Sequence, residues 1–510
     1  MNEAIPIIDL FAGPGGLGEG FSSLRGADGA VKFDIRLSIE KDAEAIKTLT
    51  WRAFYREFGK RNETVPVDYY RVMQEPDITK REKGIEVLLA DHPYGAVAKE
   101  EARQVELGSS AWPTELVDKL IRERLNGAKD WVLIGGPPCQ AYSNAGRSRV
   151  GGIHKEDHRV YLYQEYLRII KEHSPNVFVM ENVQGLLSAK VDGERVFDWM
   201  KRDLSMNGEY ELHSFVREVD EDKDFMIEAQ KFGVPQKRKR VILLGLRKGV
   251  KHLGQYLEQQ NEVPLESVIS DLPSLRSGVG KSYLGRHPHQ VTATGRPKRL
   301  YEQMEDSFET WSQVFEEGKS KLSQTALEAH VQSIEPSVES LGSEFIARKR
   351  KKTAALDGWY ADGRIKGVLN HHARTHLKQD LHRYQFAALF AEAWGRFPRL
   401  HDYEAYGEDL LPDHESAGSG NFADRFRVQM PDVPATTVTC HISKDGHYFI
   451  HYDPLQMRSL TVREAARIQT FPDNYLFRGS RTAQYHQVGN AVPPYLAHQL
   501  AGIVAAVMER

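Results

Sequence analysis

The chain has 510 residues, and this length exceeds the usual size of a single domain, so two structural units are expected. Its hydrophobic content of 40% is enough for an ordinary globular core. The formal net charge of -3 argues against a protein that coats nucleic acid over its whole surface, although it permits one basic face. Only two cysteines occur, Cys139 and Cys440. This count argues against a disulfide framework and a multi-cysteine zinc site, so no metal is expected.

The ends and the apolar runs give no sign of targeting to a membrane. The N-terminus lacks a basic segment followed by an apolar one, and no later run approaches the roughly 20 apolar residues of a membrane helix. We therefore expect a cytoplasmic protein with no membrane partner.

The first 250 residues alternate between apolar runs and amphipathic stretches, which is the pattern of an α/β sheet. The expected strands are residues 5–10, 35–40, 131–134, 176–180 and 241–246. Residues 161–171 have apolar side chains near helical spacing and are followed by Pro175, which predicts a crossover helix.

The pattern changes from about residue 251 to residue 449. This stretch is polar and charge-rich without clear alternation of strands and helices, so we expect a second, less regular domain. After Pro494, apolar residues recur at helical spacing and predict a helix that packs back on the first domain. The strongest charge block, residues 348–352, fits a solvated surface and a phosphate contact about equally well.

A glycine-rich turn, residues 13–16, follows the first strand and precedes a predicted helix over residues 17–24. Glycines let a ligand approach the backbone, and a helix N-terminus offers free N–H groups, although such turns also serve tight packing alone. The second strand ends at Glu40, where a carboxylate can accept hydrogen bonds from ribose hydroxyls. The alternative for Glu40 is a surface carboxylate that caps the helix beginning near Asp42.

Cys139 follows Gly135-Gly136-Pro137-Pro138 after a short apolar strand, so its thiol is expected at the carboxyl end of a sheet, where open α/β folds bind ligands. A lone cysteine is usually a small buried hydrophobe. Here two glycines and two prolines fix an unusual loop around it. Arg147 and Arg149 downstream favour either a thiolate or a bound phosphate.

Further polar groups are expected at the same edge. Glu181 ends the fourth predicted strand, and Gln236, Arg238 and Arg240 precede the fifth. If the chain is already extended there, these three side chains lie on one face, because strand side chains repeat every two residues. A solvent-facing carboxylate and a purely structural arginine pair are the alternatives.

An ordered set of segments resembles the motifs of the DNA cytosine-5 methyltransferases. The matching segments are DLFAGPGGLG at 9–18, GGPPCQAYS at 135–143, ENVQGLL at 181–187, QKRKR at 236–240 and QVGNAVPP at 487–494. Residues 458–473 are also similar to the family's penultimate motif. Several motifs in the family's order are far more specific than any one of them.

The resemblance implies a fold and an activity. The fold class is α/β, with a Rossmann-like S-adenosylmethionine-dependent methyltransferase domain and an inserted, smaller target-recognition domain. The implied divisions are 1–254 for the main part of the catalytic domain, 255–450 for target recognition and 451–510 for the segment that completes the catalytic domain. The implied reaction is transfer of a methyl group from S-adenosylmethionine to carbon 5 of cytosine within a specific sequence of double-stranded DNA.

The resemblance also assigns roles to residues. The cofactor would be lined by Phe11, Gly13, Gly15 and Leu17, held at its ribose by Glu40, and enclosed by Asn490 and Val492. Cys139 would be the nucleophile and Glu181 would hold the edge of the cytosine ring. Arg240 would contact the cytosine carbonyl, and Arg238 would support the active-site loop. Ser143, Arg147 and Arg149 would clamp the DNA backbone.

The sequence departs from the family at a few places. The acidic residue of the third cofactor motif is not clear, and Asp91 and Glu106 are not separated by the sequence. Tyr142 stands where the family commonly has Phe, a mild change. No residue identifies itself as the base that removes the hydrogen from carbon 5. Cys440 matches no motif and is interpreted as structural.

Three other functions compete with this one. An RNA cytosine-5 methyltransferase uses the same scaffold, although the long middle segment favours DNA. A non-catalytic DNA-binding relative would have no use for the thiol of Cys139, and a dinucleotide-dependent oxidoreductase explains only the glycine turn. By resemblance to bacterial members, we expect a monomeric enzyme. Its methylation of DNA would protect that DNA from a separate restriction endonuclease.

Overall fold

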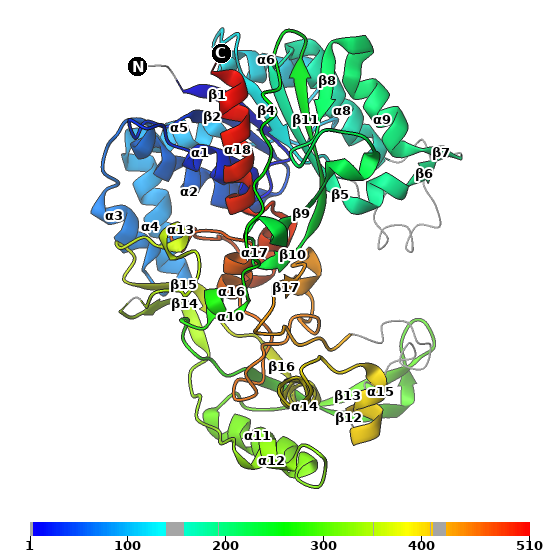
Figure 1. The fold of residues 1–510 in the computed structure, drawn as a ribbon. Coiled ribbons are helices and arrows are strands. Elements are labelled where there is room, and N and C mark those ends of the chain that lie inside the picture. The colour runs from blue at the N-terminus through cyan, green and yellow to red at the C-terminus, as the bar shows by residue number, and fades with distance from the viewer. Residues whose placement is uncertain are drawn as a thin grey trace.

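The computed structural model describes residues 4–138, 158–191, 193–349, 351–407, 410–411 and 425–509. Figure 1 shows an upper lobe built around a sheet and a lower lobe beneath it, with both chain ends on the upper lobe.

The upper lobe contains an eight-stranded sheet in the order β3-β2-β1-β4-β5-β11-β8, with β9 also paired to β11. Its first five strands are parallel, whereas β11 runs antiparallel to β5, β8 and β9. The bounds are β1 Ile5–Leu10, β2 Phe33–Glu40, β3 Ala102–Gln104, β4 Val132–Gly135, β5 Val177–Val183, β8 Tyr210–His213, β9 Met226–Glu228 and β11 Lys239–Arg247. All five predicted strands are confirmed, with ends that differ by a few residues.

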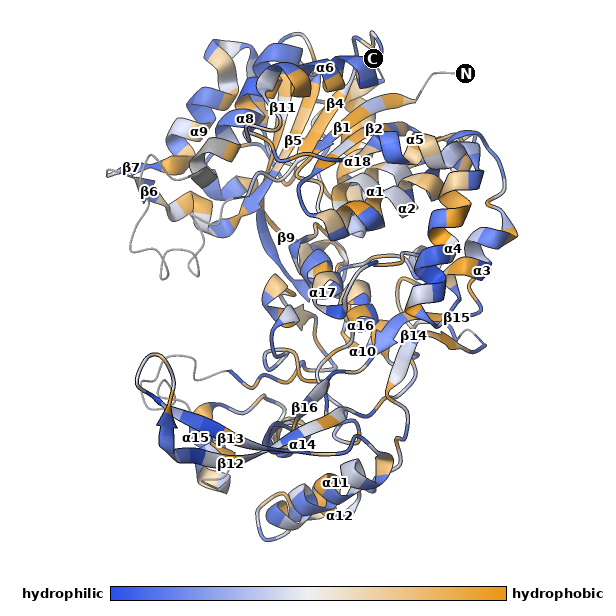
Figure 2. Ribbon diagram, turned by 180° about the vertical axis from the view of Figure 1, so that it is seen from behind, coloured by the Kyte–Doolittle hydropathy of each residue, from blue (hydrophilic) through white to orange (hydrophobic). Residues whose placement is uncertain are grey.

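Helices cover both faces of this sheet because the strand side chains alternate. On one face, Ile7 of β1 belongs to a core that includes side chains of α1 (Gly16–Ser23) and α18 (Pro494–Met508). On the other face, the adjacent Ile8 belongs to a core that includes side chains of α6 (Thr114–Leu125), α8 (His158–His173) and α9 (Val196–Ser205). Figure 2 shows the strands as an apolar layer. The fold is therefore the predicted Rossmann-like α/β arrangement, with the crossover helix (α8) and the C-terminal helix (α18) in place.

The C-terminal helix is held very close to α1, the helix that follows the glycine turn. A Cβ atom added to Gly20 would lie 2.3 Å from the Cβ of Ala497. The segment Arg481–Met508 is long and apolar enough to cross a membrane by composition alone, but 67% of its most apolar window is buried within the protein. It therefore serves as a core element of this fold.

A helical insertion follows β2. It comprises α2 (Ala43–Lys60), α3 (Val67–Met73), α4 (Ile78–Asp91) and α5 (Pro93–Glu101). Aromatic and aliphatic side chains of these helices form one core with Phe345, Ile365 and Leu369 from the middle of the chain. These residues belong to or adjoin the hairpin of β14 (Gly342–Ala347) and β15 (Gly367–His372). The insertion thus braces the middle segment against the upper lobe, as Figure 1 shows on its left side.

The lower lobe is more regular than its sequence suggested. It contains β12 (Gly278–Val291), β13 (Pro297–Gln303), β16 (Thr375–Leu377), α11 (Phe308–Leu322), α12 (Glu328–Gln332), α14 (Lys378–Trp394) and α15 (Leu400–Tyr406). Helix α14 is buried on almost every side over residues 380–391, so it shows no single apolar stripe. This explains why periodicity did not reveal it.

A third group of elements lies between the lobes. It includes β10 (Gln236–Lys237), α10 (Glu266–Ile269), α13 (Asp357–Tyr360), β17 (Ala435–Thr436), the 3-10 turn η7 (Cys440–Ser443), α16 (Val462–Ile468) and α17 (Arg481–Asn490). Their apolar side chains form one core. Parts of the predicted insertion at 255–450 therefore share a core with the C-terminal segment, and the boundaries at 254/255 and 450/451 stay predictions. The small strands β6 (Lys190–Val191) and β7 (Glu194–Arg195) form a separate hairpin.

Candidate functional site

The glycine turn after β1 has a backbone that few side chains tolerate. Phe11, Gly13 and Gly15 have φ values of 56°, 56° and 91°, and Gly15 is the N-cap of α1. A Cβ on Gly13 would meet no described atom within 4 Å. The left-handed conformation is cheap for glycine and costs about 1–3 kcal/mol for Phe11. The turn therefore exposes backbone to open space at the carboxyl end of β1.

Glu40 connects this turn to the next helix. Its carboxylate accepts hydrogen bonds from the backbone N–H groups of Gly13 at 2.9 Å, Lys41 at 2.8 Å and Asp42 at 2.9 Å. The cap of α2 is Asp42, whose carboxylate accepts from the N–H of Ala45 at 2.8 Å. The alternative interpretation of Glu40 as the helix cap is wrong, because Asp42 supplies that hydrogen bond itself.

The C-terminal motif packs directly on the turn. A Cβ on Gly16 would lie 2.2 Å from the carbonyl oxygen of Val492. Leu17 and Val492 are buried in the core beneath the turn, whereas Asn490 is exposed at the end of α17. The structure thus brings Val492 and Glu40 to the glycine turn, with Leu17 and Val492 supplying packing there, while Asn490 precedes Val492 by two residues.

Asp91 and Glu106 are separated by the structure. Asp91 is the last residue of α4, away from the strand ends. Glu106 follows β3 by two residues, and the preceding N–H of Val105 donates to the carbonyl of Glu40 at 2.9 Å. Glu106 therefore lies beside Glu40 at the carboxyl edge of the sheet, as an exposed carboxylate. The sequence lacked this distinction because β3 is only three residues long.

The second half of the site begins where β4 ends at Gly135. The described part of the chain ends here at Pro138 and resumes at His158. Four predicted site residues therefore lie outside the described residues: Cys139, Ser143, Arg147 and Arg149. A Cβ on Gly136 would lie 2.9 Å from Oε2 of Glu181. The carboxylate of Glu181 therefore abuts the backbone of the loop, three residues before Cys139 in the sequence.

Glu181 and Arg240 form an ion pair, with 2.6 Å between Oε1 and Nε. Their side chains are 15% and 16% exposed, so both are partly screened from water. The pair is held by adjacent strands, since Glu181 of β5 lies opposite Ile242 of β11. A carboxylate and a guanidinium thus lie at one strand end, ready to contact a polar planar ligand.

Arg238 is the buried member of the arginine pair. Its Nη1 donates to the carbonyl of Val438 at 2.9 Å, and its Nε has no hydrogen-bond partner among the described residues. Burial lowers the pKa of Arg238 well below its usual range, and the neighbouring charge of Arg240 lowers it further. Lys237 and Lys239 are exposed while Gln236 and Arg238 are buried and Arg240 is half-buried, so the predicted common face is confirmed.

Two buried glutamines link residues 236–240 to the C-terminal segment. Nε2 of Gln236 donates to Oε1 of Gln469 at 2.8 Å, and Oε1 of Gln236 accepts from the N–H of Val438 at 2.7 Å. Nε2 of Gln469 in turn donates to the carbonyl oxygens of Val488 and Ala491 at 2.7 and 3.2 Å. Both glutamines are fully buried. No local pattern in the sequence indicates this pairing across 233 positions.

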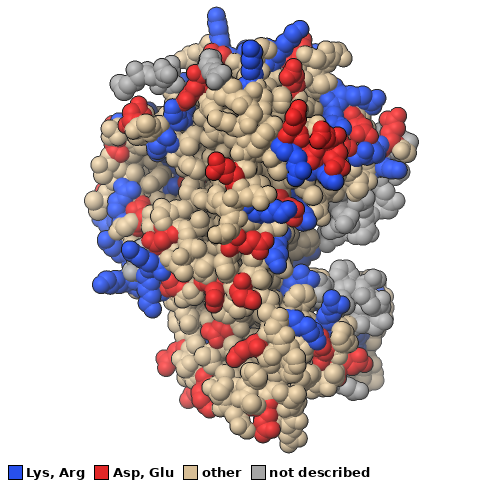
Figure 3. Space-filling model, viewed as in Figure 1, with Lys and Arg blue, Asp and Glu red and all other residues tan. Residues whose placement is uncertain are grey.

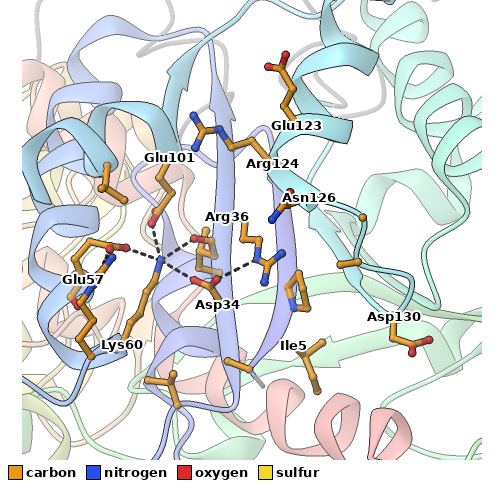
Figure 4. Close-up of a pocket in the computed structure, with 18 of the residues that line it drawn as sticks. Ile5, Asp34, Arg36, Glu57, Lys60, Glu101, Glu123, Arg124, Asn126 and Asp130 are labelled. Carbon is orange, nitrogen blue, oxygen red and sulfur yellow. Dashed lines mark hydrogen bonds and ion pairs between the residues drawn. The ribbon is translucent and has the colours of Figure 1, made fainter. Parts of the chain in front are cut away.

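A large cavity of the described residues lies elsewhere. It has a volume of about 1150 Å³ and is lined by the amino ends of strands, including Ile5, Asp34 and Asp130 (Figure 4). Lys60 at its centre pairs with Asp34 at 2.7 Å, Glu57 at 2.8 Å and Glu101 at 3.2 Å. These matched charges lie at the edge opposite Glu40 and Glu181. This cavity therefore belongs to a structural ion network.

Comparison with known proteins identifies the kind of site. The family model for C-5 cytosine-specific DNA methylase matches residues 119–505. The type II methyltransferase M.Bpa9945I of Bacillus paralicheniformis is 34% identical over 98% of this chain and 99% of its own length. The DNA (cytosine-5-)-methyltransferase M.ApeKI of Aeropyrum pernix is 28% identical over 77% of this chain and 85% of its own.

A solved structure has the same fold. It is a prophage-encoded protein from E. coli described as a candidate DNA modification methyltransferase, and it aligns with a TM-score of 0.53 at 18% identity. The alignment covers 99% of this chain and all of the other. The similarity therefore extends to the lower lobe as well as the sheet.

Proposed function

The chain belongs to the C-5 cytosine-specific DNA methylases and is a DNA (cytosine-5-)-methyltransferase, and from that premise we propose how its residues carry out the reaction. We propose that Cys139 attacks a cytosine flipped out of a specific duplex sequence and forms a covalent adduct. The observation that carries this proposal is the ion pair of Glu181 and Arg240 against Gly136, three residues before Cys139.

Cytosine carbon 5 needs activation before it can accept a methyl group. The thiolate of Cys139 forms a bond to carbon 6, and the electron pair of the 5,6 double bond moves toward carbon 5. Glu181 hydrogen-bonds ring N3 and the exocyclic amine, while Arg240 donates to the cytosine carbonyl. Both contacts stabilise charge that develops in the ring, which is the main role of preorganised polar groups in catalysis.

The adduct must then decay to product. After carbon 5 has gained its methyl group, a base removes the hydrogen from carbon 5, and the bond between sulfur and carbon 6 breaks to restore the aromatic ring. A water can serve as this base. Arg238 is buried, and its Nε has no hydrogen-bond partner among the described residues, so we assign it as the positioning residue for the loop that carries Cys139.

The glycine turn fits a methyl donor of nucleoside type. The open space over Gly13 and the carboxylate of Glu40 beside it suit an adenosine, with Glu40 accepting from the ribose hydroxyls. We propose that Glu106 accepts from the adenine amine as the acidic residue of the third cofactor motif, because the preceding Val105 is hydrogen-bonded to Glu40. S-adenosylmethionine, the family's donor, supplies an electrophilic methyl group when bound.

Several finer assignments complete the proposal. Reaching carbon 5 requires base flipping, at a cost of roughly a few kcal/mol. Ser143, Arg147 and Arg149 clamp the DNA backbone around the extruded base. The relatives are named type II methyltransferases, which supports the proposal that methylation protects DNA from a separate restriction endonuclease. We also propose that the enzyme is a cytoplasmic monomer.

The test is to trap the adduct. Mixed-sequence duplex DNA containing 5-fluorocytosine cannot lose a proton from carbon 5, so an enzyme that uses this mechanism stays covalently attached. We expect wild-type protein with S-adenosylmethionine to form a denaturant-resistant complex, and Cys139→Ser to form none. Cys440→Ala, which removes the other cysteine, is the matched control and should retain the complex. A complex formed equally by Cys139→Ser would contradict the assigned nucleophile.

A further inference from the structure

The lower lobe carries a two-stranded antiparallel ribbon that has no core of its own over most of its length. Strands β12 and β13 pair from Lys281 opposite Gln303 to Val291 opposite Pro297. Every residue from 288 to 303 is exposed. An isolated pair of strands is marginally stable in water, so such a ribbon gains from a partner that covers it.

We propose that this ribbon, residues 282–302, enters the major groove of the DNA substrate and reads its sequence. The inference rests on the proposed function, because it takes duplex DNA as the substrate. It adds a specific assignment: one element of the lower lobe, rather than the lobe as a whole, determines the target sequence.

The charge of the ribbon is opposite to that of DNA and unlike that of the chain. Residues 281–302 contain five basic side chains and one acidic one, whereas the whole chain has a net charge of -3. The basic residues are Lys281, Arg286, Arg296, Lys298 and Arg299, and the acidic one is Glu302. Figure 2 shows β13 as one of the most hydrophilic strands.

Two of these basic residues lie opposite each other, Arg286 on β12 and Arg299 on β13. Phosphate groups of DNA would contact such a basic pair and release bound counterions.

The end of the ribbon is already shaped. Residues 287–290 of β12 lie opposite Lys298 alone, which makes a wide bulge. Nδ1 of His287 accepts hydrogen bonds from the N–H groups of His289 and Gln290, both at 3.1 Å. The turn beyond is closed by the N–H of Thr292, which donates to the carbonyl of Arg296 at 2.7 Å. A preformed tip loses less entropy on binding, so more of its contact energy appears as affinity.

The size and side chains of the ribbon suit the major groove. That groove is about 12 Å wide and admits a two-stranded ribbon. The ten residues from Ser282 to Val291 can extend roughly 30 Å. Gln290 and Arg296 are of the types that hydrogen-bond the edges of adenine and guanine, whereas Lys298 and Arg299 suit phosphates.

The ribbon also lies on the side of the molecule where a duplex could reach both lobes. In Figure 1 the ends of β12 and β13 lie at the side of the lower lobe where the gap between the lobes opens. Figure 3 shows the surface hollowed on this side, with Lys and Arg side chains at the rim of the hollow. A duplex held in the hollow would therefore meet the ribbon and the strand ends that carry Glu181 and Arg240.

The experiment separates recognition of the base sequence from binding of the phosphate backbone. The full-length enzyme is compared with a Gln290→Ala/Arg296→Ala variant and a Lys298→Ala/Arg299→Ala variant. Lys83→Ala/Lys99→Ala on α4 and α5 is the matched control, because both lysines are exposed on the upper lobe. Mixed-sequence duplex DNA is methylated, and the methylated cytosines and their flanking bases are determined by bisulfite sequencing. Melting temperature and S-adenosylmethionine affinity verify that each variant is folded.

We expect the wild type and the control variant to methylate one motif. The Gln290→Ala/Arg296→Ala variant should relax that motif at particular positions, with discrimination lowered about tenfold or more. The Lys298→Ala/Arg299→Ala variant should keep the motif, raise KM for all sequences, and lower the slope of log affinity against log salt by about 2.

Each other outcome has a distinct meaning. If the wild type methylates DNA and both ribbon variants keep its motif, KM and salt slope, the ribbon does not read DNA and this inference is overturned. If the wild type methylates no DNA, the proposed function itself fails. If it methylates only RNA, the ribbon's assigned partner is wrong.

Discussion

Glu181 is the residue on which the chemistry at the strand ends most depends. Its carboxylate contacts Arg240 and abuts the backbone of Gly136. Glu181→Gln keeps the size of the side chain but removes the charge and the ion pair. We expect kcat to fall about 10²- to 10⁴-fold, since one positioned acid or base contributes that much. Affinity for S-adenosylmethionine should be unchanged.

Steady-state methylation and a separate cofactor-binding titration measure the two quantities. Glu194→Gln, at an exposed position of β7, is the matched control and should keep wild-type kcat. A Glu181→Gln enzyme with wild-type kcat would remove this carboxylate from the mechanism.

His371 makes stability depend on pH. The ring lies fully buried, with Nδ1 2.8 Å from Oγ1 of Thr461 and Nε2 2.9 Å from the carbonyl of Pro273. Burial lowers the pKa of His371 from 6.5 to about 4. Below pH 6.5 the unfolded chain binds a proton that the folded protein does not. Stability is therefore full above pH 6.5 and falls as the pH drops to about 4, by roughly 3 kcal/mol from this group.

Urea unfolding at pH 7 and pH 4.5 measures this loss. His371→Gln should lose less free energy of unfolding between the two pH values than the wild type does. His401→Gln changes a side chain that is 70% exposed and should retain the wild-type loss. An identical loss in all three proteins would show that His371 is not held neutral.

At the scale of elements, the brace between α4 and β14 has one buried ion pair at its centre. Arg81 and Glu344 are 1% and 7% exposed, and Nη2 lies 3.0 Å from Oε2. Removing one partner of such a pair costs roughly 3–5 kcal/mol, because the other charge stays buried. Arg81→Met should therefore lower the free energy of unfolding by about that much, and adding Glu344→Gln should recover part of it.

Arg71→Met is the control for this prediction. It breaks the pair with Asp68, whose side chains are 75% and 57% exposed, and an exposed pair contributes about 0–1 kcal/mol. If urea unfolding gives Arg81→Met and Arg71→Met equal costs, α4 does not hold the hairpin of β14 and β15 through this pair.

Local sequence predicted the elements whose signal lies within them. The strands of the sheet are apolar runs, and α18 has one apolar face, so both were found. Helix α14 was missed because it is buried all round, and β3 because it has three residues. The link between Gln236 and Gln469 could not be predicted, since no local pattern says which distant polar groups will meet. Motifs predicted the position of the site, but only the structure shows that Glu106 follows β3 whereas Asp91 ends α4.

At the scale of the whole molecule, the two lobes are joined on one side and open on the other. The helical insertion and the core shared by α10, α16 and α17 join them, as Figure 1 shows. Figure 3 shows the surface hollowed on the opposite side. In the proposed account, this arrangement would hold the catalytic groups and the recognition ribbon at a fixed separation around a duplex.

The most direct test of the account is to follow the methyl group. Purified wild-type protein and Cys139→Ala are incubated with tritiated S-adenosylmethionine and either mixed-sequence duplex DNA or RNA, and the labelled nucleoside is identified after digestion. Labelled 5-methylcytosine in DNA from the wild type alone is the predicted result. Label in RNA only, or label in DNA from both proteins, would contradict the account.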